Sequence, residues 1–295
     1  MERHDEKKAA VEQHYTRRGT GMDIETTILT ALANAGKNID QLTVDDLAPI
    51  DEMHTRGREA TANIASILNL QPNYHVLDVG AGIGGPSRYL ASKFGCHVTG
   101  LDLVQEYCRV ADSLAKRVKL DNLVNYRQGD ATQMPFEDAT FDIVWTQHAS
   151  MNIADKKRLY SEMYRVLKPG GGKLAIYDAF KGSNSSDIDG SAYSIHFPVP
   201  WAADPSISHL IAAEEARRLL KDVVGFKEVA WEDKTESVID WVKQMMKRAQ
   251  KTSSGPPPVG LHVIGGPQWS EMVKNALRNL EECRIAIGQG IFERS

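Results

Sequence analysis

The order of apolar and polar positions divides the chain into four regions, of which residues 73–182 have the clearest pattern. Short apolar runs in this region predict five strands, at 74–79, 98–103, 124–127, 141–146 and 173–180. Amphipathic stretches between them predict helices at 86–94, 105–119 and 155–167. Strands interleaved with helices are typical of parallel strands joined by crossover connections. The region therefore predicts an α/β core with helices on both faces of a Rossmann-like sheet.

The other three regions have different patterns of apolar and polar positions. Residues 1–72 predict a helical N-terminal cap, with helices over 6–14, 25–35 and 51–68. Residues 183–212 are rich in Ser, Asp and Pro, and we interpret them as a substrate-lid insertion because long loops in compact domains often cover binding sites. Residues 213–295 are interpreted as the C-terminal completion of the core fold. Their pattern predicts helices over 213–224, 237–250 and 268–287 and strands over 226–231 and 288–294.

Composition narrows the function classes. The formal net charge of −4 argues against a nucleic-acid partner, since phosphate backbones attract clustered Lys and Arg. The three cysteines, Cys96, Cys108 and Cys283, match neither a disulfide framework nor a zinc pattern, and no metal site is predicted. No apolar stretch is long enough for stable membrane insertion, so we expect a cytoplasmic protein. Whether it forms a homo-oligomer stays open.

The sharpest local feature is a glycine-rich turn after the first predicted strand of the core. The sequence reads Asp78-Val79-Gly80-Ala81-Gly82-Ile83-Gly84-Gly85, and a predicted helix follows. Glycine allows a tight turn and a close approach of backbone to ligand. Gly80, Gly82 and Gly85 also satisfy the G-x-G-x-x-G spacing of dinucleotide-binding proteins. The glycines alone therefore leave two ligand classes open, a dinucleotide and S-adenosylmethionine.

Acidic residues discriminate between these ligands. Asp78 lies two positions before the first glycine, where a carboxylate would repel a pyrophosphate but attract the sulfonium and ammonium groups of S-adenosylmethionine. Asp102 follows Gly82 by about 20 residues, the spacing at which a carboxylate accepts hydrogen bonds from a ribose. Asp130, in Gly129-Asp130-Ala131, could accept from an adenine amino group. Together they favour S-adenosylmethionine as the cofactor.

These segments, together with Arg165-Val166-Leu167-Lys168-Pro169-Gly170-Gly171, resemble the ordered motifs of class I S-adenosylmethionine-dependent methyltransferases. The resemblance is to the small-molecule branch that includes ubiquinone/menaquinone-type and sarcosine/dimethylglycine methyltransferases. It implies a seven-stranded, mostly parallel sheet whose last strand is antiparallel. It also implies that Asp78 and Gly80 lie near the methionine part of the cofactor, Gly82 at its backbone contact, Asp102 at the ribose, and Asp130 with Ala131 at the adenine. Leu103, Gln147 and Tyr15 complete the predicted cofactor contacts.

The acceptor site is expected past the carboxyl ends of the strands. His148, just beyond the fourth strand, is the predicted base because an imidazole titrates near neutrality. Asn152 stands where many members of the family carry a histidine. His196 and Trp201 in the insertion are predicted to contact the acceptor. Asp51, His54 and Arg58 are predicted near one face of the helix over 51–68, and His54 joins the acceptor contacts.

The resulting prediction is methyl transfer by in-line displacement to a small-molecule acceptor, with N-methylation favoured slightly by the resemblance. A C- or O-methyltransferase of an apolar or phenolic metabolite is the first alternative. An NAD-dependent oxidoreductase and a non-catalytic S-adenosylmethionine-binding module are alternatives of other classes. An adenine-type nucleic-acid methyltransferase is disfavoured, since Thr146-Gln147-His148-Ala149 replaces the Asp/Asn-Pro-Pro-aromatic sequence of those enzymes.

Overall fold

The computed structural model describes residues 2–16, 23–184, 195–251 and 257–295, and its centre is a seven-stranded sheet. The strand order is β3-β2-β1-β4-β5-β7-β6. Neighbours among β1 to β5 pair in parallel, and β7 runs antiparallel to both β5 and β6. The predicted α/β class, the seven mostly parallel strands and the antiparallel last strand are confirmed.

The strands are β1 (His75–Val79), β2 (His97–Asp102), β3 (Val124–Gln128), β4 (Ile143–Gln147), β5 (Gly172–Lys181), β6 (Lys227–Asp233) and β7 (Ile285–Arg294). The α-helices are α1 (Glu2–Thr16), α2 (Ile24–Asn34), α3 (Val44–Asp51), α4 (Gly57–Leu68), α5 (Gly85–Phe94), α6 (Gln105–Arg117), α7 (Lys156–Val166), α8 (Ala213–Arg218), α9 (Thr235–Lys251) and α10 (Trp269–Glu281).

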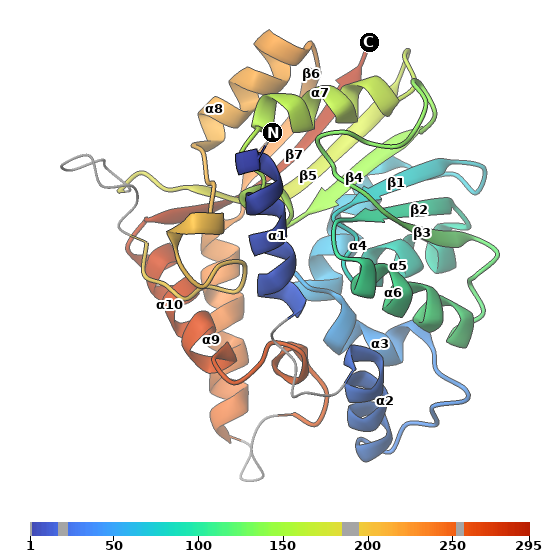
Figure 1. The fold of residues 1–295 in the computed structure, drawn as a ribbon, viewed down its shortest axis with the longest axis vertical. Helices are drawn as coiled ribbons and strands as arrows, with labels where there is room; N and C mark the ends of the chain where they lie inside the picture. The colour runs from blue at the N-terminus through green and yellow to red at the C-terminus, as the bar shows by residue number, and fades with distance from the viewer. Residues whose placement is uncertain (1, 17–22, 185–194, 252–256) are drawn as a thin grey trace.

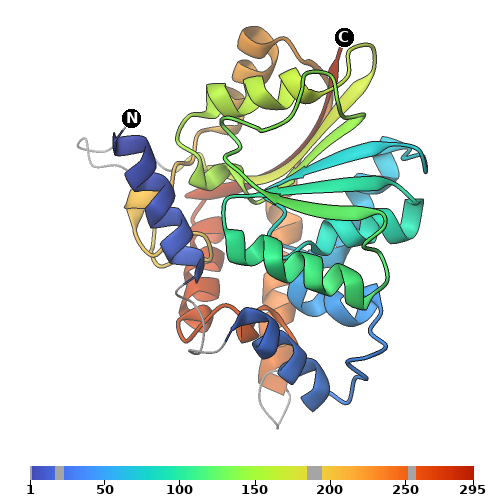
Figure 2. The same ribbon diagram turned by 45° about the vertical axis from the view of Figure 1, so that its right-hand side comes forward.

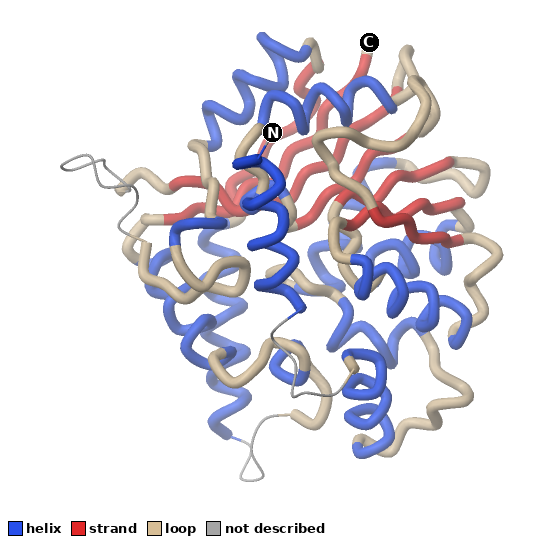
Figure 3. The backbone as a smooth tube through the Cα atoms, in the orientation of Figure 1, coloured by secondary structure: helices blue, strands red, loops and turns tan. Residues whose placement is uncertain are grey.

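Helices cover both faces of the sheet, as Figure 1 and Figure 3 show. Leu159 and Met163 of α7 and Leu220, just after α8, pack on one face with Val144 and Ile176 of the sheet. The other face is covered by α4, α5, α9 and α10, and α6 packs along β2 and β3. Helix α1 lies outside both layers in Figure 1 and Figure 2. That placement leaves α1 free to contribute to a site at the edge of the sheet.

The single helix predicted over 51–68 is wrong, because the chain forms two helices there. Helix α3 starts at a capping box in which Thr43 and Asp46 satisfy each other's backbone amides, and it ends at Asp51. Helix α4 starts only at Gly57, after Arg56 adopts a left-handed conformation with φ of 61°. The intervening residues 52–56 are therefore a loop, and His54 lies in it.

The helix predicted over 268–287 is also too long. Helix α10 ends at Glu281, Cys283 turns the backbone with φ of 54°, and β7 begins at Ile285. All ten residues of β7 pair with β5, so the sheet extends three residues earlier than the sequence predicts. The segment between β6 and β7 thus contains both α9 and α10, and it is larger than a simple completion of the core.

The predicted lid insertion over 183–212 lies partly outside the described residues, which resume at Ile195. The described part carries a short 3-10 helix at Pro205–Ile207, and buried Trp201 and Ile207 join the core cluster that also contains α10. No described helix is long and apolar enough to cross a membrane.

Candidate active site

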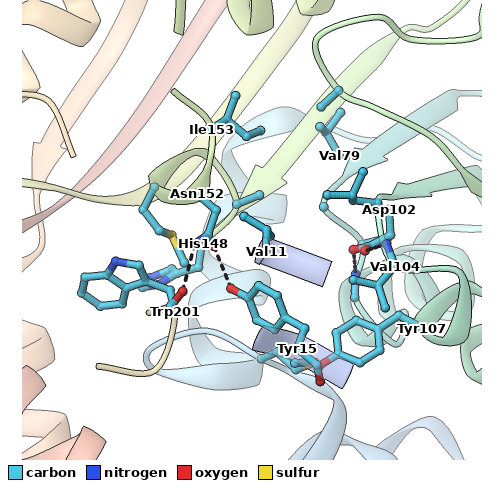
Figure 4. A pocket seen from close by; sticks show the side chains of 18 of the residues that line it. Val11, Tyr15, Val79, Asp102, Val104, Tyr107, His148, Asn152, Ile153 and Trp201 are labelled. Atoms are coloured by element: carbon cyan, nitrogen blue, oxygen red, sulfur yellow. Dashed lines mark hydrogen bonds between the residues drawn. The ribbon is translucent and has the colours of Figure 1, made fainter. Parts of the chain in front are cut away.

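A cavity of about 210 Å³ opens at the carboxyl ends of β1, β2 and β4, where α/β sheets bind their ligands. Figure 4 shows Asp102 and Val104 on one side and His148, Asn152 and Trp201 on the other. The cavity brings together all but one of the residues predicted from sequence. They are Tyr15, His54, Asp78, Gly80, Gly82, Asp102, Leu103, Asp130, Ala131, Gln147, His148, Asn152 and Trp201.

The glycine loop forms the floor of the cavity because its backbone folds as no other residue readily would. Gly80 and Gly82 have φ of 76° and 55°, and the Gly80 amide donates to the carbonyl of Leu101 at 2.8 Å. A Cβ built on Gly80 would lie 2.3 Å from the Cβ of Ala149, in the loop after β4. The two loops therefore touch through a contact that only glycine permits.

We expect Gly80→Ala to be destabilising and to weaken ligand binding in this cavity. The added methyl group must push the β4 loop away, which typically costs about 1–3 kcal/mol beyond the backbone strain. Gly170→Ala is the matched control, since Gly170 has φ of 74° but nothing within 4 Å of the added atom. Urea denaturation of both variants isolates the contact, and equal losses of unfolding free energy would show that the contact has no cost.

Two carboxylates stand beside the loop. Burial, reinforced by nearby Asp102, raises the pKa of Asp78 to about 7, although the Ser87 hydroxyl donates to Asp78 at 2.6 Å. Asp102 accepts from the Gly82 amide at 2.8 Å and from the Val104 amide at 2.9 Å, one on each oxygen. Burial also raises the pKa of Asp102. A cation or hydroxyl donors placed in the cavity would stabilise the ionised form of both carboxylates.

Asp130 lies at the outer end of this side and contacts α1. The Lys8 ammonium is 2.6 Å from one carboxylate oxygen, and the Thr132 amide and hydroxyl both donate to the other at 2.8 Å. Burial alone would raise the pKa of Asp130, but the hydrogen bonds from Lys8 and Thr132 lower it overall. Asp130 therefore stays ionised and holds α1 against the cavity.

A further buried carboxylate, Asp51 at the end of α3, also lines the cavity. Its Oδ2 accepts from Arg88 of α5 at 2.8 Å, and both side chains are excluded from solvent. Asp51 Oδ1 is buried with no hydrogen-bond partner among the described residues. A ligand donor is a natural partner for this oxygen.

His148 occupies the opposite wall. It adopts a left-handed backbone with φ of 49°, and its Nε2 lies 3.1 Å from the Thr55 hydroxyl, which is 2.9 Å from the Tyr177 hydroxyl. Burial lowers the pKa of His148, with Asp178 acting in the opposite direction. The imidazole is therefore neutral near pH 7.

His54 lies beside His148, with 6.4 Å between ring centroids. Its Nε2 is 3.0 Å from the Thr61 hydroxyl and 3.1 Å from Glu52 Oε2. Its Nδ1 is buried and has no partner in the part of the chain that the structure describes. Burial, with a contribution from His148, lowers the pKa of His54.

The outer wall is tied together by Asn152. Its side-chain oxygen accepts from the Tyr15 hydroxyl at 2.8 Å, and its amide donates to the carbonyls of Trp201 and Ile207, both at 2.9 Å (Figure 4). The indole of Trp201 is buried and donates to Ser208 at 3.0 Å. Asn152 thus links α1 to the insertion.

His196 is the one predicted contact that the structure does not bring into the cavity. Its Nε2 lies 3.0 Å from Glu282, just after α10, and its backbone amide donates to Asn279 at 2.9 Å. The prediction of an acceptor contact is corrected accordingly. The prediction that Asp51, His54 and Arg58 share a helix face also fails, since Arg58 turns to Glu52 and Asp45.

Several residues in or next to the cavity were not predicted from the sequence. Lys8 reaches Asp130 from α1, and Glu52 and Thr55 act through the two histidines. The segment between α9 and α10 adds Leu261, Ile264 and Gly265, and the first residue of α10 adds Trp269. Polar residues flanking His54 in Glu52-Met53-His54-Thr55 were the available clue. The segment between β6 and β7 offered no such clue, because the residues with which it lines the cavity look like ordinary apolar positions.

Comparison with known proteins identifies the central segment. Residues 77–175 match the family model described as a methyltransferase domain. The chain is 33% identical over 126 residues to the glycine/sarcosine/dimethylglycine N-methyltransferase of Actinopolyspora halophila, covering 43% of this chain and 22% of that protein. It is 40% identical over 118 residues to the sterol 24-C-methyltransferase of Candida albicans, covering 39% of this chain and 31% of that protein. The resemblance predicted from the sequence motifs is confirmed.

The fold agrees with a solved structure as well. Phosphoethanolamine N-methyltransferase 2 of Haemonchus contortus superposes with a TM-score of 0.70 at 22% identity, over 83% of this chain and 54% of that one. The chain spans less than half the length of the curated relatives it matches, at 38%, 22% and 44% of the first three.

Proposed function

Because residues 77–175 belong to the class I S-adenosylmethionine-dependent methyltransferases, we propose that the protein transfers a methyl group from S-adenosylmethionine to a small molecule. One observation carries the proposal: the donor-side carboxylates and the two histidines line the same cavity. Bound there, S-adenosylmethionine would supply a methyl carbon made electrophilic by its sulfonium. The protein would hold donor and acceptor close and aligned.

The donor side fits this cofactor on three counts. The positive φ angles of Gly80 and Gly82 let the backbone turn tightly at the cavity that both residues line, and Asp51 Oδ1 is a buried acceptor without a partner among the described residues. Asp78 favours a cationic ligand because ionisation there is otherwise opposed by burial. Asp102 would accept from the ribose hydroxyls, and Asp130 with Ala131 would border the adenine. Leu103, Gln147 and Tyr15 would complete the enclosure.

The acceptor side is formed by His54, His148, Asn152 and Trp201. His148 is the base predicted from sequence, and it remains a candidate because its neutral imidazole reaches the cavity. The names of the relatives include N- and C-methyltransferases, so they support the slight preference for nitrogen only weakly. A cytoplasmic location is part of the proposal, supported by three cysteines that form no disulfide.

Calorimetry tests the donor assignment. We expect S-adenosylmethionine to bind and to release about half a proton near pH 7, since Asp78 titrates at about 7 and a cation beside it lowers that pKa. Titrations in two buffers of different ionisation enthalpy measure the proton. S-adenosylhomocysteine, whose sulfur is neutral, should release less, and Asp78→Asn should abolish the difference. Binding of NAD without binding of either adenosyl compound would overturn the proposal.

A further inference from the structure

Besides Asp51 Oδ1 on the donor side, the cavity is lined by buried nitrogen atoms that have no partner in the described part of the chain. Among the described residues that line it, His54 Nδ1, Gln147 Nε2 and His209 Nε2 are buried and make no hydrogen bond. Unsatisfied buried polar atoms are rare, and they point to a ligand or water in the cavity. His54 differs from the other two because its second ring nitrogen is held by a carboxylate.

Hydrogen bonding fixes the tautomer of His54. The Thr61 hydroxyl has one proton to donate. Its oxygen lies 2.7 Å from Glu52 Oε2 and 3.2 Å from Gln147 Oε1, and both of these oxygens are acceptors. When Glu52 is ionised, the Thr61 hydroxyl donates to one of these oxygens and accepts from His54 Nε2 at 3.0 Å, and Glu52 Oε2 at 3.1 Å accepts as well. Nε2 carries the hydrogen, so Nδ1 carries a free lone pair.

Glu52 is placed to stabilise a protonated His54. It is 2% exposed and also accepts from Arg58 Nε at 2.5 Å. Burial, with the nearby Asp51 charge, raises the pKa of Glu52, while burial lowers that of His54. A proton that arrives on Nδ1 creates an imidazolium whose Nε2 already contacts this carboxylate. The arrangement is that of a base with its orienting acid.

The lining limits the chemistry of the acceptor. Apolar and aromatic side chains make up much of the lining of the cavity, among them Met53, Met151, Trp201, Ile264 and Trp269. The cationic side chains in the lining are Lys7, which is exposed, and Lys8, which lies on Asp130. Among the described residues, no arginine lines the cavity to clamp a carboxylate or a phosphate. An apolar acceptor with a weakly acidic group fits these walls better than an amino acid or a phosphoamine.

Resting on the proposed methyl transfer, we propose that His54, oriented by Glu52, is the base that deprotonates a phenol- or enol-like hydroxyl of an apolar acceptor. The hydroxyl proton moves to His54 Nδ1, and the freed oxygen electron pair forms the bond to the methyl carbon. The carbon–sulfur bond breaks and its electron pair stays on sulfur, which yields S-adenosylhomocysteine. The proton on His54 then leaves to solvent. His54 is a catalytic residue in this scheme, and Glu52 is a positioning residue.

A coloured phenol tests the base without knowledge of the natural acceptor. 4-Nitrophenol absorbs differently as phenol and phenolate, so its spectrum with the S-adenosylhomocysteine-loaded protein reports proton transfer. Near the pKa of the free probe, we expect a phenolate fraction on the protein that depends on His54, because the charge of the paired phenolate offsets the burial that lowers the pKa of His54. His54→Gln should lose the phenolate band, and transfer of labelled methyl to the probe should fall by about 100-fold or more. The matched control is His97→Gln, an exposed histidine at the start of β2.

Nitrogen NMR of the S-adenosylhomocysteine-loaded protein without the probe gives a second readout that does not depend on turnover. We expect His54 to be neutral at pH 7 with Nε2 protonated and Nδ1 bare. Glu52→Gln should retain probe binding but lose the phenolate band, because the imidazolium loses its counter-charge. Thermal unfolding and affinity for S-adenosylhomocysteine show whether each variant is folded.

The measurements distinguish failure of the proposed methyl transfer from failure of the assigned base. Failure to bind S-adenosylhomocysteine would refute the proposed function itself. Normal binding together with a protonated Nδ1 in the probe-free protein, no binding of 4-nitrophenol, or a phenolate band that survives in His54→Gln would overturn only the assignment of the base and its acceptor. A band lost in His148→Gln but kept in His54→Gln would transfer the base to His148. Methylation of dimethylglycine in preference to the phenol would likewise overturn the acceptor class.

Discussion

Asp102→Ala should weaken the affinity for S-adenosylhomocysteine by about 100-fold. A carboxylate that accepts two ribose hydroxyls makes charge-assisted hydrogen bonds worth about 1.5–3 kcal/mol each, and every 1.4 kcal/mol is about tenfold in affinity. The substitution also removes the acceptors of the Gly82 and Val104 amides, which shape the glycine loop and the start of α6. Calorimetric titration of the folded variant measures the loss.

Asp102→Asn sharpens this test. Each oxygen of Asp102 accepts one backbone amide, so an asparagine must place its NH₂ group against one of two N–H donors. We therefore expect Asp102→Asn to restore little of the affinity that Asp102→Ala loses. At an exposed site without such amide donors, asparagine could replace aspartate with little effect. Asp121→Ala, at an exposed position before β3, is the matched control and should leave affinity unchanged. An affinity of Asp102→Ala within about threefold of the unsubstituted protein would remove Asp102 from the ligand site.

The donor side of the site could be predicted because its determinants are local in the sequence. Asp78, Gly80 and Gly82 occupy one strand–turn–helix unit, Asp102 ends the next strand, and Asp130 follows the strand after it. Parallel strands place their carboxyl ends together, so the sequence spacing alone brings these residues to one edge. The structure does place all five in one cavity.

The acceptor side could be predicted only in part, because its geometry depends on contacts between distant segments. The sequence singles out His54, but the partners of this histidine depend on a loop that the helical pattern over 51–68 conceals. Trp269 arrives from a segment between β6 and β7 whose apolar residues look like ordinary core positions. After α10, Ile287 lies seven residues beyond Leu280, as on a helix face, and two beyond Ile285, as in a strand, and pairing with β5 decides for the strand. Local pattern cannot rank such alternatives without the partner strand.

Arg88 and Asp51 form the ion pair whose disruption should cost the most stability. Arg88 is 0% and Asp51 1% exposed, and Arg88 also donates to the carbonyls of Ile83 at 2.7 Å and Ala111 at 3.2 Å. Arg88→Met leaves the Asp51 carboxylate buried without its counter-charge, and breaking such a pair typically costs about 3–5 kcal/mol. We expect the free energy of unfolding in urea to fall by that amount.

A double-mutant cycle separates the charge effect from lost packing. Asp51→Asn alone leaves the Arg88 guanidinium buried and uncompensated, but combined with Arg88→Met it removes both charges, so the double variant should lose less than the two single losses added together. The matched surface pair is Lys243–Glu281, both roughly half exposed, whose disruption should cost at most about 1 kcal/mol. Additive losses at Asp51 and Arg88 would show that the pair is not coupled. Because Asp51 ends α3 and Arg88 lies in α5, coupling would also mean that this pair helps to hold α3, and the loop with His54 that follows it, against α5.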